Sequence, residues 1–194
     1  MNKNILLCGV GGQGIVLTSK LIAAASMEKN IPVMSAETIG MAQKGGSVFS
    51  FLKTGENLYC PMFSEGMADL IIGFEPAEAV RMLPYLEADG TVIVNSHPIM
   101  PVTAALNGGT YNGGEMIDYL KANVKNIFVL DGDEVCRKIG SPKVLNMVML
   151  GGAIKSGCLP FTLDEIKETV QKTVNPKFYE LNCKALDEAN KLIR

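Results

Sequence analysis

A glycine-rich stretch near the amino terminus carries the clearest chemical signal in the sequence. It reads GVGGQG over residues 9–14 and directly follows an apolar run over residues 4–8. A strand that ends in glycines and turns into a helix directs backbone N–H groups at one point, where the helix dipole adds partial positive charge. The stretch therefore predicts a site for an anion such as a phosphate group. The spacing of its glycines also matches the dinucleotide-binding pattern.

A second glycine loop is predicted between the second and third strands. It reads GMAQKGGSV over residues 40–48, with Lys44 beside two glycines. We expect it to lie near the first loop, at the carboxyl edge of the sheet, so that backbone N–H groups and one cation face the same bound anion. The two loops together predict a single anion-receptive edge. Its residues are Gly9, Gly11, Gly12, Gln13, Gly14, Gln43, Lys44, Gly45, Gly46 and Ser47.

Three other interpretations of the first loop stay open. An NAD or FAD site would use an acidic residue at the end of the second strand to bind the ribose, and Glu37 is near enough. An ATP site of the ubiquitin-activating type would need arginine and aspartate contacts, but only Arg81 and Arg137 precede the C-terminal arginine. In the third interpretation both loops serve only for packing, and the chain is a purely structural subunit.

The elements that would position these loops indicate an α/β fold. Strands are predicted at 4–8, 31–34, 47–53, 69–74, 91–95 and 126–130, and helices at 14–29, 76–86 and 116–124. The turn at 54–57 suggests a hairpin that returns through 58–60. The C-terminal third is predicted to be helical, with a capping box at Thr162 and a proline-led start at Asn175. We expect one domain over residues 1–194, a three-layer Rossmann-like sandwich whose mostly parallel sheet contains an antiparallel hairpin.

Composition excludes several classes of function. The net charge of −2 comes from 18 basic and 20 acidic residues without a long run of either sign, which argues against nucleic-acid and polybasic membrane binding. No segment reaches the roughly 20 apolar residues of a membrane span. The five cysteines are scattered, which favours the reducing cytoplasm over a disulfide framework, and none has the C-x-x-C spacing of a cluster ligand.

The remaining candidates for chemistry are weak. The only histidine, His97, precedes Pro98 in a predicted turn and has no evident Cys, His or Asp partners. The stretch DGDE, residues 131–134, is similar to the opening of a thiamine diphosphate motif, but no asparagine pair follows at a suitable distance. We interpret it as a strand-to-helix turn with acidic capping. No catalytic residue and no metal ligand is predicted in this chain.

Three motifs in sequence resemble a known family. GVGGQG, GMAQKGGSV and ADLIIGFEPAEA (residues 68–79) are closely similar to the gamma-type subunit of 2-oxoacid:ferredoxin oxidoreductases. Within that family they resemble most the indolepyruvate ferredoxin oxidoreductase beta subunits, which consist of this domain alone. The likeness continues through residues 92–95 and 146–151. One departure is Lys44, where arginine is common in the family; the charge is kept, but a bidentate contact would be lost.

The resemblance implies the oxidative decarboxylation of a 2-oxoacid to an acyl-coenzyme A, with indolepyruvate or another aryl 2-oxoacid as the expected substrate. In that family thiamine diphosphate does the carbon chemistry, iron–sulfur clusters pass electrons to ferredoxin, and coenzyme A takes the acyl group. The clusters and the main thiamine site belong to a large catalytic subunit. We therefore expect this chain to bind no cofactor alone and to be inactive without its partner. Residues 40–47 and 62–67 are the predicted contact surface.

Overall fold

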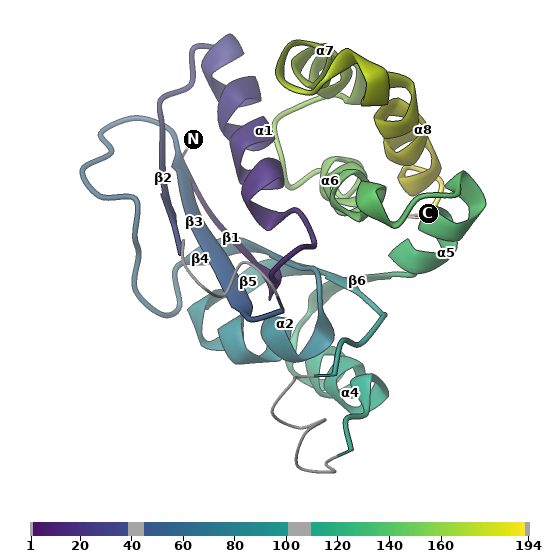
Figure 1. Ribbon diagram of the computed structural model, residues 1–194. Helices are drawn as coiled ribbons and strands as arrows, with labels where there is room; N and C mark the ends of the chain where they lie inside the picture. The colour runs from purple at the N-terminus through teal and green to yellow at the C-terminus, as the bar shows by residue number, and fades with distance from the viewer. Residues whose placement is uncertain (1, 39–44, 101–109, 193–194) are drawn as a thin grey trace.

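The computed structural model describes residues 2–38, 45–100 and 110–192. Six strands form one sheet with helices on both faces, so the predicted three-layer α/β sandwich is confirmed (Figure 1). No helix among the described residues is long and apolar enough to cross a membrane. The strands are β1 (Lys3–Val10), β2 (Val33–Glu37), β3 (Ser47–Thr54), β4 (Ala68–Gly73), β5 (Leu86–Asn95) and β6 (Asn126–Leu130).

The strands lie in the order β2-β3-β1-β4-β5-β6. β1, β4, β5 and β6 pair in parallel, whereas β3 runs antiparallel to β1 on one side and to β2 on the other. The parallel strands read as nearly continuous apolar runs because both of their faces are covered. The mostly parallel sheet with an antiparallel excursion is therefore confirmed, and its carboxyl edge carries the glycine loops.

The helices divide unequally between the two faces (Figure 1). Residues of α1, α5, α6, α7 and α8 join one core cluster with one face of the sheet, and residues of α2 and α4 join a second cluster on the other face. The first layer contains the helical C-terminal third that the sequence predicts. The helices are α1 (Ile15–Glu28), α2 (Pro76–Met82), α4 (Gly113–Asn123), α5 (Gly132–Ile139), α6 (Leu145–Lys155), α7 (Leu163–Thr173) and α8 (Tyr179–Ala189).

Short 3₁₀ turns and helix caps mark several boundaries. The 3₁₀ turns are η2 (Leu83–Tyr85), η3 (Pro142–Val144) and η4 (Pro176–Phe178). The predicted helix at 76–86 ends earlier, at Met82, because Pro84 lies in η2 and Leu86 already begins β5. The capping box at Thr162 is confirmed, as is the side-chain cap that Asn175 supplies to η4.

The predicted hairpin through residues 58–60 is wrong. Those residues form no strand, and the chain leaves the sheet after Thr54 in a loop that returns at Ala68. The physical reason is that both edges of β3 are already occupied, by β1 and by β2, so no backbone groups remain to pair a returning strand. The antiparallel hairpin of this fold is instead β2–β3.

Candidate functional site

The two glycine loops lie side by side, as the sequence predicts. The Gly11 N–H donates to the Gly46 carbonyl at 2.8 Å, and the Gly45 N–H donates to the Gly11 carbonyl at 3.1 Å. These bonds continue the antiparallel β1–β3 ladder, in which Val10 is paired with Ser47. The loops are therefore neighbours because their strands are hydrogen-bonded to each other. Gln43 and Lys44 lie outside the described residues.

Two of the glycines in the first loop are required for packing. A Cβ at Gly9 would lie 2.7 Å from the Phe74 Cβ, and one at Gly14 would lie 2.8 Å from the Asn146 Cβ. Gly14 also has a φ of +88°, which L side chains rarely adopt. The packing interpretation of the glycine pattern thus holds at these two positions, where the loop presses α1 against the sheet and α6.

Gly12 differs from its neighbours because its surroundings are open. It has a φ of +107°, and a Cβ built there would meet no atom within 4 Å. It borders a shallow cavity of about 310 Å³ in front of the amino terminus of α1. The N-cap residue Gly14 supplies no side-chain hydrogen bond, so the first-turn N–H groups of α1 have no cap from that residue. Unpaired N–H groups at a helix start favour an anion. The cavity is lined by Gly11, Gly12, Gly14, Ile15, Val16 and Val48.

Gln13 holds the loop in place. Its Oε1 accepts from the Val10 N–H at 2.7 Å, and its Nε2 donates to the Phe74 carbonyl at 2.8 Å. Its own N–H donates to the Val10 carbonyl at 3.2 Å. Of the backbone N–H groups of Gly11, Gly12 and Gln13, those of Gly11 and Gln13 therefore have internal acceptors. The Gly12 N–H has none among the described residues.

Ser47 contacts Arg81, a cation at this edge that was not among the site residues predicted from the sequence. Its Oγ donates to the Glu78 carboxylate at 2.6 Å, and the Arg81 guanidinium donates to both the Ser47 hydroxyl and Glu78. The guanidinium also lies 5.9 Å from the centre of the Phe49 ring. Arg81 is nearly half exposed, so part of it faces solvent beside the Gly45–Ser47 turn. The three-residue spacing of Glu78 and Arg81 predicts an ion pair on α2. Only the fold shows that this pair faces Ser47 of β3.

A buried carboxylate organises the next strand end. Glu75 is 1% exposed and accepts from the Glu78 N–H at 2.9 Å and from the Ile99 N–H at 3.3 Å. It also accepts from the Tyr111 hydroxyl, whose pKa is raised well above its ordinary value by burial and by this carboxylate. A buried carboxylate needs such hydrogen-bond donors because water no longer solvates it. Glu75 thus joins three chain segments at the carboxyl edge, and these hydrogen bonds explain why a carboxylate is buried there.

The DGDE stretch is a helix cap, in agreement with its interpretation from sequence. The Asp131 carboxylate accepts from the Glu134 N–H at 2.8 Å at the start of α5. Asp133 accepts from the Asn95 amide at 3.1 Å, and the Gly132 N–H donates to the Asn95 Oδ1 at 3.1 Å. Asp131 therefore caps α5, and Asp133 holds α5 against β5 through Asn95.

The cysteines do not converge. Cys8 and Cys136 are buried, Cys60 is exposed, and Cys158 and Cys183 are partly exposed. Burial raises the pKa of the Cys8 thiol strongly and that of Cys136 to about 11, so neither is a thiolate at neutral pH. Within residues 2–38, 45–100 and 110–192, no group of three or more Cys, His, Asp or Glu side chains is placed to hold a metal ion.

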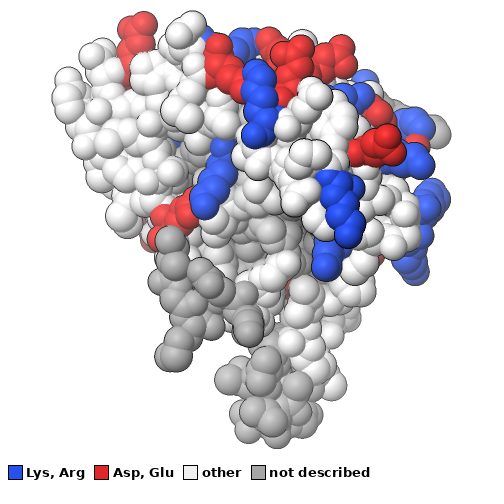
Figure 2. All heavy atoms as spheres, turned by 45° about the horizontal axis from the view of Figure 1, so that its top comes forward, with Lys and Arg blue, Asp and Glu red and all other residues white. Residues whose placement is uncertain are grey.

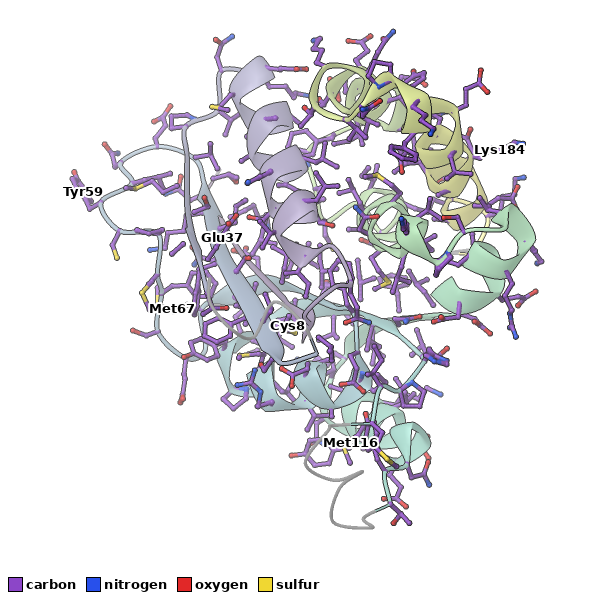
Figure 3. All side chains as sticks on the ribbon, in the orientation of Figure 1. Cys8, Glu37, Tyr59, Met67, Met116 and Lys184 are labelled. Carbon is purple, nitrogen blue, oxygen red and sulfur yellow. The ribbon has the colours of Figure 1, made fainter. Side chains whose placement is uncertain are left out.

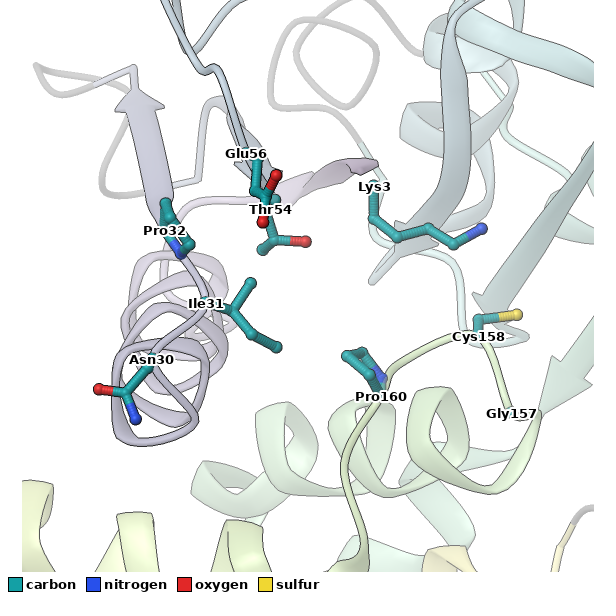
Figure 4. Close-up of a pocket in the computed structure, with 10 residues that line it drawn as sticks. Lys3, Asn30, Ile31, Pro32, Thr54, Glu56, Gly157, Cys158 and Pro160 are labelled. Carbon is teal, nitrogen blue, oxygen red and sulfur yellow. The ribbon is translucent and has the colours of Figure 1, made fainter. Parts of the chain in front are cut away.

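A second cavity opens at the opposite edge of the sheet (Figure 4). It measures about 380 Å³ and lies between the start of β1, the end of β3 and the segment that follows α6. Lys3 borders it but is paired with Asp69 at 2.8 Å, and the hydrogen bond to that carboxylate raises the pKa of Lys3. Because the glycine loops are at the other end of β1, this cavity does not belong to the candidate site. It is lined by Lys3, Asn30, Ile31, Pro32, Thr54, Gly55, Glu56, Gly157, Cys158 and Pro160.

Comparison with known proteins identifies the family. The family model for pyruvate ferredoxin/flavodoxin oxidoreductase matches residues 4–192. The chain belongs to this family. It is 36% identical over 187 residues to the indolepyruvate oxidoreductase subunit IorB of Archaeoglobus fulgidus, covering 96% of this chain and 92% of the relative. The pyruvate/ketoisovalerate oxidoreductases common subunit gamma of Pyrococcus furiosus is more distant, at 23% identity over 93% of this chain and 91% of the relative.

Solved structures share the fold of this chain. The pyruvate oxidoreductase subunit PORC of Thermotoga maritima superposes with a TM-score of 0.74 at 18% identity, over 100% of this chain and 97% of that chain. The 2-oxoglutarate:ferredoxin oxidoreductase of Magnetococcus marinus also gives 0.74, at 20% identity, over 98% of this chain but only 31% of that chain. The fold thus occurs both as a separate chain and as a part of a longer one. The resemblance predicted from the three motifs is confirmed.

Proposed function

We propose that this chain is the non-cluster subunit of a thiamine diphosphate-dependent 2-oxoacid:ferredoxin oxidoreductase whose substrate is indolepyruvate or another aryl 2-oxoacid. The observation that carries the proposal is the family match over residues 4–192, together with 36% identity over nearly full length to a relative named as an indolepyruvate oxidoreductase subunit. The partner is a large catalytic subunit, and ferredoxin accepts electrons through the complex. The scattered cysteines suit a reducing compartment, and we place the enzyme in the cytoplasm.

The described residues do not fit the iron–sulfur clusters or the metal-binding part of a thiamine diphosphate site. The cysteines are not arranged as iron–sulfur ligands, and the Asp131 carboxylate caps a helix where a thiamine motif would need it for a metal ion. We therefore assign the clusters and thiamine diphosphate to the partner. When bound there, thiamine diphosphate supplies the decarboxylation chemistry.

The glycine edge fits an anionic guest. The cavity at the start of α1 has the Gly12 N–H and the first-turn N–H groups at its border, and Arg81 lies beside the neighbouring Gly45–Ser47 turn. We propose that this edge, with Gln43 and Lys44, binds a phosphate group of coenzyme A or thiamine diphosphate, or a carboxylate of the partner. In this proposal Lys44 supplies a full charge and the backbone supplies the dipoles.

Reconstitution tests the proposed function. The purified chain alone should be colourless, contain no stoichiometric iron and show no 2-oxoacid-dependent reduction of ferredoxin or a viologen dye. Co-expression with a large subunit that carries thiamine and ferredoxin-type cysteine motifs should yield a coloured complex that requires both coenzyme A and a 2-oxoacid. The large subunit alone is the control. Activity or bound iron in the isolated chain would contradict the proposal, as would a complex that oxidises no aryl 2-oxoacid.

A further inference from the structure

The loop between β3 and β4 exposes a group of apolar side chains. We name residues 55–67 the 55–67 loop. Tyr59 is 89% exposed, Met62 56% and Met67 46%, and Cys60 is exposed as well. Tyr59 and Met67 project outward from the same side of the molecule (Figure 3). Single exposed apolar side chains are ordinary, whereas several on one continuous surface mark an interaction site.

The other large exposed hydrophobics do not form such a group. Met27 belongs to α1, Tyr119 to α4 and Phe178 to η4, while Met100 follows β5 and Leu192 follows α8. They match the scattered pattern that a monomer tolerates. The concentration of tyrosine and methionine in the 55–67 loop is therefore a property of that loop, and not of the surface as a whole.

The 55–67 loop is anchored to the body of the protein. The Phe63 ring is buried and packs edge-to-face on Phe51, with ring centres 4.8 Å apart, and on Tyr85 at 6.4 Å. Backbone bonds fix both ends: the Gly55 N–H donates to the Pro32 carbonyl, and the Gly66 N–H donates to the Pro84 carbonyl, each at 2.9 Å. A surface that is already ordered loses little conformational entropy when it binds.

The charge pattern defines what the loop would fit. The side of the molecule that carries the loop shows a broad surface without Lys, Arg, Asp or Glu, whereas charged side chains gather over the C-terminal helices (Figures 1 and 2). Glu56 and Glu65 stand near the two ends of the loop, are exposed, and make no ion pair within the part of the chain that the structure describes. The complementary surface is an apolar hollow with basic residues at its rim.

We propose that the 55–67 loop docks into such a hollow on the large catalytic subunit. The proposal rests on the proposed function, which supplies the identity of the occupant. Tyrosine is a frequent anchor at protein interfaces, because it buries a large ring at a low cost in rotamer entropy. Methionine adapts its shape to a partner surface. Tyr59 and Met62 are the anchors, and Glu56 and Glu65 face the basic rim.

Binding of the purified chain to the large subunit tests this surface. The double variant Tyr59→Asp/Met62→Asp should raise the Kd for the large subunit at least a hundredfold. The double variant Met27→Asp/Tyr119→Asp is the matched control, since it places the same two charges on an exposed methionine of α1 and an exposed tyrosine of α4, and it should change the Kd less than threefold. Thermal unfolding of the isolated variants checks that their fold is retained. Equal binding by the double variant and the control would overturn the proposal.

Hydrogen exchange of the wild-type pair gives a measurement that needs no variant. Backbone amides of residues 56–65 should exchange at least tenfold more slowly in the complex than in the free chain, while those at the carboxyl end of α8 should be unchanged. Unchanged exchange in the 55–67 loop of a formed complex would overturn the docking surface and leave the proposed function standing. Absence of any complex, together with absence of reconstituted activity, would overturn both.

Reversing the charges of Glu56 and Glu65 tests whether they face basic residues at the rim of the hollow on the large subunit. The double variant Glu56→Lys/Glu65→Lys should slow association roughly tenfold at low salt, with the difference shrinking as salt is added, because exposed charges act mainly on the association rate. Exposed Glu180, at the start of α8, serves as the matched position for a Glu→Lys control. An association rate that is unchanged, or faster, for the double variant would show that no basic rim faces the loop.

Discussion

At the scale of single residues, the glycines of the first loop look alike in the sequence but have different surroundings in the structure. Gly9 and Gly14 allow close packing against Phe74 and Asn146, whereas a Cβ added at Gly12 would have no neighbour within 4 Å. Gln13 contributes through its side chain, which joins the ends of β1 and β4. The anion-binding role that we propose for this loop therefore rests on Gly12 and the first turn of α1.

Alanine substitutions separate packing from binding. Gly14→Ala should lower the unfolding free energy by about 2–5 kcal/mol, because it combines a left-handed backbone with overpacking against Asn146. Gly12→Ala has only the backbone penalty of about 1–2 kcal/mol and should leave the fold intact. In the reconstituted enzyme its methyl group should instead weaken coenzyme A use or subunit affinity. Denaturant unfolding and coenzyme A dependence measure the two effects. If Gly12→Ala changes neither coenzyme A use nor affinity, the loop serves packing alone.

At the scale of elements, the strand ends on the carboxyl edge are held together by side-chain bridges. Asn95 is buried and connects the Phe74 carbonyl, the Gly132 N–H and Asp133, so β4, β5 and α5 share one residue. Asp131 then caps α5. Acidic residues in this region therefore have structural partners, which accounts for a thiamine-like sequence in a chain to which we assign no thiamine site.

Substitution at Asp131 distinguishes capping from metal binding. Asparagine also caps helices well, so Asp131→Asn should preserve both the unfolding free energy, to within about 0.5 kcal/mol, and the activity of the complex. Asp131→Ala should cost about 0.5–2 kcal/mol of stability, since it removes the acceptor for the Glu134 N–H. Thermal unfolding and reconstituted activity are the measurements. A loss of activity in Asp131→Asn at unchanged stability would indicate that the carboxylate itself takes part in chemistry.

At the scale of the whole molecule, the strand order bears on the dinucleotide interpretation. That interpretation pairs the first glycine loop with Glu37 at the end of β2. In this sheet β3 lies between β1 and β2, so Glu37 is two strands away from the loop. Neighbouring strands are about 4.8 Å apart, which places β2 roughly 10 Å from β1. In a dinucleotide-binding fold, β2 lies next to β1 and its acidic residue reaches the ribose. Here a ribose bound at the glycine loop would lie beside β3 instead.

Calorimetry with NAD tests this consequence of the topology. The isolated chain should show no binding of NAD or ATP at micromolar concentration, because Glu37, the acidic residue expected to bind the ribose, lies two strands away from the glycine loop. Glu37→Ala should likewise leave the stability and the reconstituted activity unchanged. Micromolar NAD binding that is lost in Glu37→Ala would restore the dinucleotide interpretation.

The sequence by itself determined the family, the α/β class and most of the elements, since each depends on local pattern. The apolar run at 126–130, the capping box at Thr162 and the three family motifs can be recognised without knowing where any other part of the chain lies. It also predicted that the two glycine loops lie side by side, because both were expected at the carboxyl edge of one sheet. The family motifs, the apolar runs and the helix caps can be read from sequence because the forces behind them act over a few residues.

Only the tertiary structure decided which strands pair with β3 and which side chains lie beside the glycine loops. Inserting β3 antiparallel between β1 and β2 occupied both of its edges, removed the expected hairpin at 58–60 and separated Glu37 from the glycine loop. The same insertion brought Ser47 to Glu78 and Arg81. Strand pairing joins residues far apart in the chain, and its register and order are set by which surfaces the helices leave to be covered. No local pattern in the sequence records that choice.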